Sequence, residues 1–470
     1  MERAFYMSPT PSLRAAVVGT GHRAQTFTRG LAERPGHRVA ALCDPSPTRM
    51  AFHNRLLTAA GEPPAAQWDP DRFADLLGEE GIDEVIVTTV DAEHDRYIVP
   101  ALRAGCRVVT EKPMTVDADR CARILDTVRE TGNSLTVAFN YRFNPVHEKV
   151  RALLARGAVG EVLSVHFEWL LDVRHGADYF RRWHRDKRRS GGLMVHKSSH
   201  HFDLVNWWLA DEPQEVFGYG RLGFYGREAG ERHGLRREYA RAHGAGPAAD
   251  DPFALDLAAN DTLRALYLDA ERDDGYLRDR NVFDGPVTIE DDMAVLVRYA
   301  RGATMTYHLT AYSPWEGYRV MINGSAGRLE LEVEESRWAR PSTRAASERG
   351  AVHGDTAAEH AGGARLTLRP LWQPPVDIPL DVDHEAHGGG DPRMLDALFG
   401  PVGAVRPGTE PGTAADPDAA AHPTATERDG ALALVVGLAA NRSFGTGAPV
   451  RTGTLLPGTP APCGDGPAVN

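Results

Sequence analysis

Lysine is rare in this chain, so a lysine inside a motif carries information. Of the 53 lysines and arginines, four are lysine: Lys112, Lys149, Lys187 and Lys197. Arginine is too basic to exchange a proton near neutrality, whereas burial lowers the pKa of lysine toward that range. Lys112 ends an apolar run and lies between Glu111 and Pro113. We predict that it is the central catalytic residue.

A second group with chemical potential is His196, His200 and Asp203. On a predicted helix over 194–209, spacings of four and three residues put these side chains on one face, with His201 turned away. A histidine with an ordinary pKa near 6.5 relays protons at physiological pH. We predict that His200 and His196 are catalytic. A hydrogen-bonded core histidine is the alternative for His200, and it is our prediction for His201.

The same histidines bear on metal binding, because two histidines four residues apart form half of a zinc site. His184 or His387 would supply a third ligand. Hydrogen bonds to a hydroxylated substrate explain these imidazoles as well, and we predict no metal.

The sequence Gly19-Thr20-Gly21-His22-Arg23-Ala24 follows the first predicted strand and opens a helix. In that context glycines allow a tight turn and a close approach of a dinucleotide pyrophosphate. Asp44 comes 20 residues after Ala24, where a carboxylate accepts hydrogen bonds from ribose hydroxyls and repels a 2′-phosphate. The pattern predicts NAD as the cofactor and makes NADP less favoured, with the nearby Arg49 as the contrary sign.

The N-terminal part alternates between short apolar runs and helical patterns. Predicted strands cover 13–19, 39–43, 84–89, 107–110 and 134–139, and predicted helices cover 25–33, 72–78, 95–103 and 121–130. This βαβ series predicts an α/β Rossmann domain with a parallel sheet over residues 1–140.

Beyond Pro145 the pattern changes. Helices are predicted over 146–154 and 194–209, a closing helix over 431–440, and strands over 162–171, 294–299, 304–311, 319–322 and 328–333. Short turns join the later strands. They predict an α+β domain with a large, mostly antiparallel open sheet over 141–455, which serves substrate binding and oligomerisation.

Several segments depart from this plan. A polar stretch over about 227–286, with a helix-like piece over 261–268, reads as an insertion on the second domain. Segments 336–363 and 401–429 are rich in Ala, Gly, Pro and Thr, so we predict that they are mobile and carry no chemistry. We predict a flexible tail over 456–470.

Charge and composition exclude several classes of protein. The net charge of −12 argues against a nucleic acid or an anionic membrane as the main partner. No apolar run is long enough to span a bilayer and no signal-type segment is present, so we expect a cytoplasmic protein. The four cysteines form no CxxC pair and are expected to be reduced thiols.

Four motifs together resemble the glucose-fructose oxidoreductase, inositol dehydrogenase and rhizopine-catabolism (Gfo/Idh/MocA) family. Residues 105–113 (GCRVVTEKP) resemble its AGxxVxxEKP segment, Thr89 to His94 its TPxxxH segment, residues 139–145 its nYRfnP segment, and Gly191 to Asp203 its GG…H…D helix. The resemblance covers the Rossmann half and the second domain's sheet.

The resemblance implies hydride transfer between the nicotinamide and a secondary alcohol carbon of a sugar, cyclitol or related metabolite, with Lys112 at the reacting oxygen and His200 as acid/base. Glu111 would orient Lys112 or the nicotinamide end, or would be a solvated loop carboxylate. The implied cofactor-binding residues are Gly19, Thr20, Gly21, His22, Arg23, Asp44, Thr89, His94, Glu111 and Lys112.

The substrate side is less well defined. We predict that Arg142, Lys197, Asp203 and Trp315 contact the substrate. Arg181, Arg182 and Arg185 would bind a carboxylate or phosphate, or would belong to a solvated loop. A homodimer or homotetramer is expected by analogy alone.

One departure from the family pattern leaves the net reaction open. Many members carry an aspartate four residues before the histidine, where this chain has His196 followed by Lys197. Three hypotheses follow: a net dehydrogenase or reductase; a redox-neutral epimerase, lyase or glycosidase with tightly bound NAD; and a non-catalytic NAD-binding sensor, which the presence of Lys112 and His200 argues against.

Overall fold

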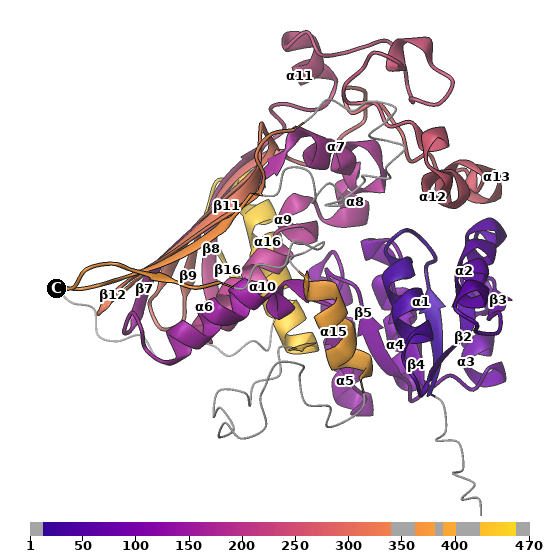
Figure 1. Cartoon of the computed structure of the whole chain (residues 1–470), viewed down its shortest axis with the longest axis horizontal. Helices are drawn as coiled ribbons and strands as arrows, with labels where there is room; N and C mark the ends of the chain where they lie inside the picture. Colours follow the sequence, from indigo (N-terminus) through magenta and orange to yellow (C-terminus); the bar gives the residue numbers. More distant parts are fainter. Residues whose placement is uncertain (1–12, 340–361, 381–388, 401–423, 457–470) are drawn as a thin grey trace, which may run out of the picture.

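The computed structural model describes residues 13–339, 362–380, 389–400 and 424–456. Figure 1 shows a first domain of helices around a small sheet, and beside it a large sheet with helices on the face turned toward the first domain. The predicted mobile segments and tail lie largely outside the described residues. Within the described residues no helix has both the length and the apolarity needed to cross a membrane.

The first sheet has seven strands in the order β15-β6-β5-β4-β1-β2-β3. The pairs among β1 to β6 are parallel, and β15 pairs antiparallel with β6. The predicted Rossmann domain is therefore confirmed. The strands are β1 Leu13–Val18, β2 His37–Cys43, β3 Ala66–Trp68, β4 Glu84–Val87, β5 Arg107–Thr110, β6 Leu135–Val137 and β15 Ala425–Thr426.

Helices cover both faces of this sheet, which explains why its central strands are continuous buried runs rather than alternating ones. The helices are α1 Ala24–Ala32, α2 Pro47–Ala59, α3 Phe73–Glu79, α4 His94–Arg103 and α5 Ala118–Thr131. The sequence did not predict α2 or β3. The buried face of α2 includes Arg49 and His53 beside Met50 and Leu57, so its apolar stripe is interrupted.

The second sheet has nine strands in the order β14-β13-β12-β11-β7-β10-β9-β8-β16, and its neighbouring strands are antiparallel except β7 with β10. Side chains of β9 alternate between buried and exposed, as expected for a sheet covered on one face. The prediction of a large, mostly antiparallel sheet is confirmed. The strands are β7 Val162–Asp172, β8 Pro213–Arg221, β9 Asp292–Tyr299, β10 Thr304–Ser313, β11 Glu316–Gly324, β12 Gly327–Ser336, β13 Ala364–Pro370, β14 Val376–Ile378 and β16 Val450–Arg451.

The remaining helices follow along the chain, and most of them lie between the large sheet and the first domain, whereas α11 lies away from it (Figure 1). They are α6 Pro145–Ala155, α7 Val173–Arg181, α8 Lys187–Ser190, α9 Leu193–His196, α10 Ser199–Leu209, α11 Arg227–Arg232, α12 Asp261–Leu263, α13 Glu271–Asp274, α15 Gly390–Phe399 and α16 Glu427–Thr446. The predicted single helix over 194–209 is wrong: a turn at Lys197 and Ser198 separates α9 from α10. His196 and His200 therefore lie on different helices and do not share one helical face.

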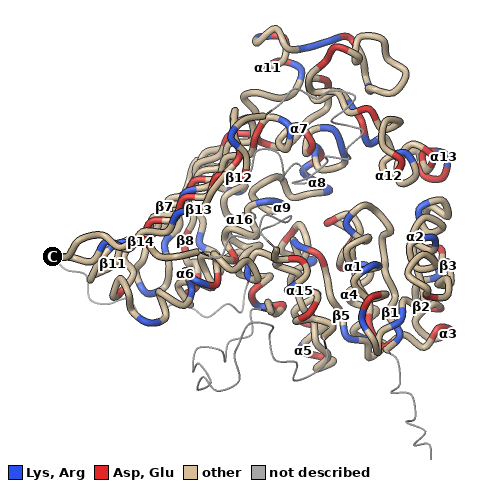
Figure 2. Tube along the Cα trace, viewed as in Figure 1, with Lys and Arg blue, Asp and Glu red and all other residues tan. Residues whose placement is uncertain are grey.

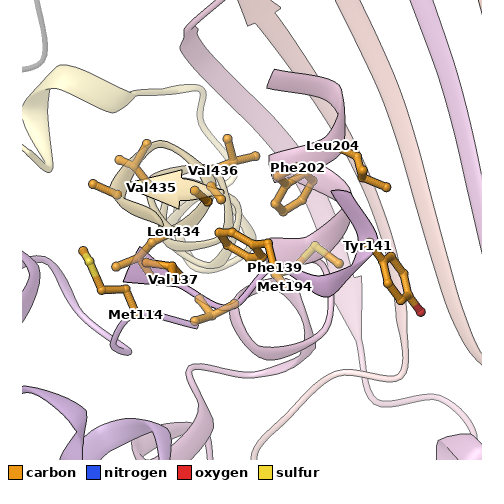
Figure 3. Packing of buried hydrophobic residues seen from close by; sticks show 14 of the residues in the cluster. Met114, Val137, Phe139, Tyr141, Met194, Phe202, Leu204, Leu434, Val435 and Val436 are labelled. Atoms are coloured by element: carbon orange, nitrogen blue, oxygen red, sulfur yellow. The ribbon is translucent and has the colours of Figure 1, made fainter. Parts of the chain in front are cut away.

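The long helix α16 fixes the two domains against each other. A Cβ on Gly430 would lie 2.8 Å from Val137 Cγ2 of the first sheet, and a Cβ on Gly437 would lie 2.5 Å from the Met194 carbonyl oxygen of α9. The helix thus approaches both neighbours so closely that a larger residue than glycine would clash at these two positions. Figure 3 shows side chains of both domains gathered around it, among them Met114, Val137, Met194, Phe202, Leu434 and Val436.

The end of the described chain returns to the first domain. Leu395, Leu398 and Phe399 of α15 pack in one apolar cluster with Phe27 and Leu31 of α1, and β15 extends the first sheet. The two domains are therefore not two consecutive stretches of the chain, because α15 and β15 join the first domain. Residues 424–429, placed in a predicted mobile segment, instead form β15 and the capped start of α16, which corrects that prediction.

Candidate active site

A cavity of about 1440 Å³ lies between the two domains. Sites for one small molecule usually enclose about 300–1,000 Å³, so this cavity has room for a dinucleotide and a second ligand. Its walls come from the loops after β1, β2, β4 and β5, from α7 to α10, and from the insertion.

The glycine-rich loop after β1 forms one wall. Gly19 has φ +83°, and a Cβ there would lie 2.7 Å from the Thr89 backbone nitrogen, so the turn requires glycine. A Cβ on Gly21 would meet nothing within 4 Å, which leaves open space beside the loop. The first amides of α1 have no side-chain cap. The loop and the helix start therefore fit a pyrophosphate.

Asp44 lies at the end of β2 and lines the same cavity. Its Oδ2 accepts from the Thr20 backbone N–H at 2.7 Å, and its Oδ1 accepts from the Ser46 N–H at 2.8 Å and from Arg49 Nε at 3.0 Å. Arg49 also pairs with Asp274 of the insertion. Two carboxylates already pair with the Arg49 guanidinium, so it is not available to bind a 2′-phosphate. The polar groups around Asp44 therefore fit NAD. The Thr20 side chain itself is buried behind the loop.

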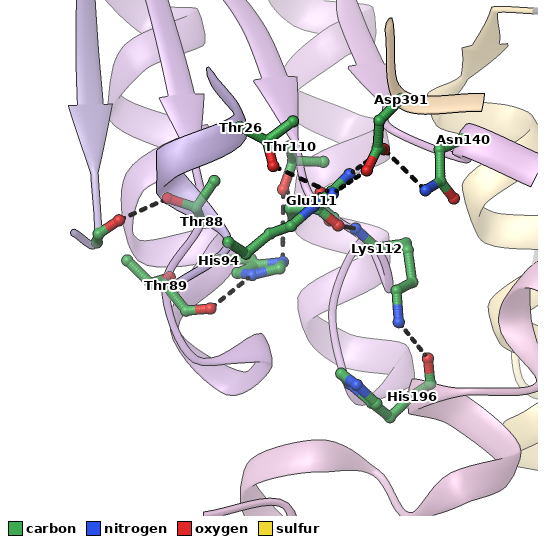
Figure 4. A network of polar contacts seen from close by, with 12 residues as sticks. Thr26, Thr88, Thr89, His94, Thr110, Glu111, Lys112, Asn140, His196 and Asp391 are labelled. Atoms are coloured by element: carbon green, nitrogen blue, oxygen red, sulfur yellow. Dashed lines mark hydrogen bonds and ion pairs between the residues drawn. The ribbon is translucent and has the colours of Figure 1, made fainter. Parts of the chain in front are cut away.

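Glu111 links the glycine-rich loop to the loop after β5, which carries Lys112. Its Oε1 accepts from Arg23 Nε at 2.5 Å, and its Oε2 accepts from the Lys112 backbone N–H at 3.1 Å. Arg23 also forms a two-pronged pair with Asp391 of α15 at 2.7 and 2.9 Å, and Asn140 Nδ2 donates to Asp391 at 2.9 Å. Figure 4 shows Glu111, Asp391 and Asn140 converging beside Lys112. Glu111 is thus part of a hydrogen-bonded network and is not a solvated carboxylate.

His94 lies behind the cavity wall and does not line it. Its Nδ1 is 2.9 Å from the Pro113 carbonyl oxygen and its Nε2 is 3.3 Å from the Thr89 carbonyl oxygen. Figure 4 shows it between these two loops. His94 therefore supports Thr89, which lines the cavity, and the residue after Lys112.

Lys112 projects from the end of β5 toward α9. Its Nζ donates to the His196 carbonyl oxygen at 3.1 Å, as Figure 4 shows. Burial lowers the pKa of Lys112 to about 8, against the opposing charges of Asp91 and Glu111. An amine with that pKa exchanges a proton near neutral pH.

His196 lies next to Lys112 and is paired with a carboxylate from the first domain. Its Nδ1 is 2.6 Å from Asp91 Oδ2, so one proton lies between the two atoms. Burial raises the pKa of Asp91, and the charges of Lys112 and Arg182 oppose that shift. This chain thus places the carboxylate of Asp91 beside His196, although the aspartate four residues before His200 is absent.

His200 also lines the cavity. Its ring stacks on Tyr141 with centroids 4.4 Å apart. His201 points elsewhere, with its Nδ1 2.6 Å from the Tyr307 hydroxyl in the core, which confirms the prediction for that residue.

A further buried polar cluster lines the cavity. Glu316 Oε1 is 2.7 Å from His175 Nδ1, and His175 Nε2 is 3.2 Å from the Tyr179 hydroxyl. Burial raises the pKa of Glu316 to about 8 and lowers the pKa of His175 to about 4. Lys197 Nζ donates to the Tyr141 hydroxyl at 3.3 Å. This cluster presents donors and acceptors suited to hydroxyl groups.

Three predicted substrate residues lie outside the cavity lining. Arg142 and Asp203 form a buried two-pronged ion pair, both contacts at 2.7 Å, and Asp429 at the start of α16 lies 3.1 Å from the same guanidinium. This cluster joins α10 to α16. Trp315 stacks under Arg319 instead, while its neighbour Glu316 lines the cavity.

Arg181 and Arg185 hold the insertion in place and do not lie in a solvated loop. Arg181 donates to the Phe253 carbonyl at 2.8 and 3.1 Å, and Arg185 donates to the Pro286 carbonyl at 3.0 Å. Among the residues that the structure describes, no three His, Cys, Asp or Glu side chains are placed to hold a metal ion. His387, one of the two ligands considered, lies outside them.

Sequence reasoning missed Asp91, Asp391 and His175. Asp91 had a weak signal, because it lies between the Thr89 and His94 of a motif already singled out. The others are isolated polar residues whose partners are distant along the chain.

Two family models match the chain. Residues 13–139 match the oxidoreductase family's NAD-binding Rossmann fold, and residues 151–367 match the oxidoreductase family's C-terminal alpha/beta domain. "Putative oxidoreductase YteT" of Bacillus subtilis (strain 168) is 34% identical over 387 residues, covering 79% of this chain and 85% of that protein. The scyllo-inositol 2-dehydrogenase (NAD(+)) of the same organism is 26% identical over 219 residues, 45% of this chain and 58% of that protein.

Solved structures share the fold. An Agrobacterium radiobacter oxidoreductase, solved in complex with NAD+, L-tartaric acid and magnesium, aligns with a TM-score of 0.60 at 16% identity, covering 95% of this chain and 100% of that chain. The aldose-aldose oxidoreductase from Caulobacter crescentus, complexed with glycerol, aligns at 0.59 and 17%, covering 94% and 99%. The family matches, together with the NAD-compatible loop, establish that this chain is an NAD-binding oxidoreductase of the Gfo/Idh/MocA family.

Proposed function

We propose that this oxidoreductase transfers hydride between the nicotinamide and a secondary alcohol or ketone of a sugar, cyclitol or related polyol. The observation that carries the proposal is the cluster of Lys112, His196 and Asp91 in the cavity that the glycine-rich loop lines. When bound, NAD supplies the hydride acceptor, and the chain must supply groups that move the hydroxyl proton.

Lys112 is suited to that task. With a pKa lowered to about 8, a substantial fraction of its amines is neutral at neutral pH and can accept the proton of the substrate hydroxyl. In the reverse direction the ammonium form donates a proton to the developing alkoxide. The contact with the His196 carbonyl holds Nζ at the cavity side of the loop.

Two histidines offer routes for the proton. The bond to Asp91 fixes the ring of His196, and His200 lines the same cavity, held by its stack on Tyr141. We assign His196 and His200 as the acid/base pair that exchanges protons with Lys112 or with a second substrate hydroxyl.

The substrate class rests on the chemistry of the lining. Lys197, His175 and Glu316 offer hydrogen-bond donors and acceptors over the second-domain side of the cavity. A polyol satisfies such groups with its hydroxyls, and the relatives of this chain include proteins named as inositol dehydrogenases.

The test is incubation of purified protein with NAD and a panel of sugars, uronates and cyclitols, following absorbance at 340 nm and products by mass spectrometry. We expect NADH to form with at least one polyol. Neither NADH nor a new product over the whole panel would contradict the proposal.

A second candidate is a redox-neutral enzyme that oxidises its substrate transiently. It is favoured by the insertion, whose Tyr267 hydroxyl accepts from the His22 backbone N–H at 3.3 Å and so lies on the glycine-rich loop. A new product without net NADH in the same assay would select this candidate.

We also propose a cytoplasmic homo-oligomer assembled through the outer face of the large sheet. Leu163, Tyr219 and Leu296 are 52%, 67% and 47% exposed on the described chain. Light scattering coupled to size exclusion tests the assembly: a dimer or tetramer is expected, and a monomer at micromolar concentration would contradict it.

A further inference from the structure

Part of the insertion reaches back to the first domain. We call residues 255–280 the clasp. Figure 1 shows its helices α12 and α13 next to α2 rather than over the sheet from which the insertion departs. Leu263, Leu266 and Tyr267 of the clasp form a small apolar cluster, against which Phe52 of α2 packs.

The clasp binds the start of α2, which follows shortly after Asp44 in the sequence. Asp273 Oδ2 accepts from Ser46 Oγ at 2.5 Å and from the Thr48 backbone N–H at 3.2 Å. Asp274 pairs with Arg49, the residue that also binds Asp44. The clasp is therefore anchored at the ribose-binding end of the dinucleotide site.

A second contact lies on the glycine-rich loop. The Tyr267 hydroxyl accepts from the His22 N–H, an amide of this loop just before α1, and the Arg278 guanidinium lies 5.5 Å from the centroid of the Tyr267 ring. Burial lowers the pKa of His22 to about 4, and the charges of Arg278 and Arg182 lower it further, as expected for cations close to this loop.

Arg278 has more donors than acceptors. Its side chain is 1% exposed, and one nitrogen, Nη2, donates to Asp178 at 2.5 Å. Its Nε and Nη1 have no hydrogen-bond partner, although the residue lines the cavity. Leaving the N–H groups of a buried cation unpaired is costly, which favours a shift of this side chain toward an anionic acceptor in the cavity.

The surroundings of Arg278 are cationic. Asp178 faces three guanidinium groups, with Arg181 at 3.4 Å, Arg182 at 3.1 Å and Arg278 at 2.5 Å. Burial raises the pKa of Asp91, which is paired with His196, and the charge of Arg182 opposes that rise. Figure 2 shows basic positions gathered at α7 and α8 above the first domain.

We propose that Arg278, together with Arg182 and Tyr267, binds the pyrophosphate of the dinucleotide on the side of the clasp. The amides at the start of α1 bind the pyrophosphate on the side of the first domain. The clasp then covers the cofactor and must open before the cofactor leaves. Cofactor retention is a property of the insertion, and it accounts for a segment that hydride transfer itself does not need. This inference rests on NAD binding and not on the proposed substrate.

Binding measurements on the full chain test the inference without any turnover. Arg278→Gln removes the charge and keeps hydrogen-bonding capacity; the matched control is Arg264→Gln, an exposed clasp residue outside the cavity. We expect the Kd values of NADH and ADP-ribose to rise about 10-fold or more in Arg278→Gln, as for loss of a hydrogen bond to a charged group. The Kd of adenosine, which lacks phosphate, should stay unchanged, and the control should bind all three normally.

A carboxylate on the substrate would also suit Arg278. NADH and ADP-ribose carry the pyrophosphate but no substrate, so their binding distinguishes the two anions. Unchanged Kd values for NADH and ADP-ribose in Arg278→Gln would overturn the proposal and assign the arginine to the substrate. An equal loss for adenosine would also overturn it, because the effect would then be general damage to the site.

A second variant covers the case in which Arg278→Gln does not fold. Asp273→Asn with Asp274→Asn releases the clasp and leaves Arg278 in place. We expect NADH to dissociate several-fold faster in stopped-flow fluorescence, and an unchanged dissociation rate would overturn the covering role.

Discussion

The two walls of the active-site cavity are built in different ways. The cofactor wall comes from loops of one Rossmann domain, and its main recognition elements, Gly19, Gly21 and Asp44, lie within 26 residues of one another. The substrate wall joins Asp91 to His196 and His175 to Glu316, pairs separated by 105 and 141 positions. Short-range backbone geometry therefore sets cofactor binding, whereas long-range packing sets the chemistry.

Lys112 connects the two walls, and its removal should separate their functions. Lys112→Met keeps the length and apolar body of the side chain but leaves no group for the hydroxyl proton. We expect turnover to fall by about 10²–10⁴-fold, the usual contribution of acid–base catalysis, with the NADH Kd changed less than about threefold. Steady-state kinetics and fluorescence titration measure the two quantities.

The control for that prediction is Lys149→Met, an exposed lysine on α6. It should match the unaltered protein in both assays. Undiminished turnover in Lys112→Met would remove the lysine from the mechanism, and so would the same loss in both variants.

Replacing Asp44 tests how much the cofactor wall contributes to NAD binding. Asp44→Ala should weaken NAD binding by about 10–100-fold, because a charged acceptor for ribose hydroxyls is lost. Arg49 stays held by Asp274 in this variant, so we expect little gain for NADP. Adding Asp274→Ala frees the guanidinium for a 2′-phosphate and should raise the ratio of NADP to NAD affinity by a further factor of about ten.

Titration calorimetry with both dinucleotides checks this order. Equal ratios in the single and double variants would show that Arg49 has no part in discrimination. The double variant also loosens the clasp, so its NADH dissociation rate is compared with that of Asp273→Asn alone.

The helix between the walls offers a stability test. A methyl group on Gly437 would press on the Met194 carbonyl at 2.5 Å, whereas Gly445, in the same helix, has nothing within 4 Å. Gly437→Ala should lower the free energy of unfolding by about 1–3 kcal/mol through overpacking. Gly445→Ala should raise it by about 0.4–1 kcal/mol, since alanine restricts the unfolded chain. Denaturant titration distinguishes them, and equal effects would refute the role given to the close contact.

What the sequence could predict follows the same division. Alternating apolar runs predicted both sheets, and the glycine spacing with Asp44 predicted the cofactor wall, because these depend on local geometry. Arg142 and Asp203 were assigned to the substrate from their motifs, yet they form a buried pair whose further partner, Asp429, is 287 residues beyond Arg142. Polar residues in a motif do not reveal which distant carboxylate will bury them.

The smallest expected effect is on the pH dependence of Lys112. Oxidation should speed up as pH rises through about 8, because the neutral amine accepts the proton. The Asp91 carboxylate raises the pKa of Lys112, so Asp91→Asn should move the rise in kcat/KM to lower pH while the amide keeps a hydrogen bond to His196. Asp95→Asn, which removes a carboxylate paired with Arg123 outside the cavity, is the control and should leave the profile in place. An unchanged profile would show that Asp91 carries its proton near neutrality, and a shift toward higher pH would contradict the charge effect assigned to Asp91.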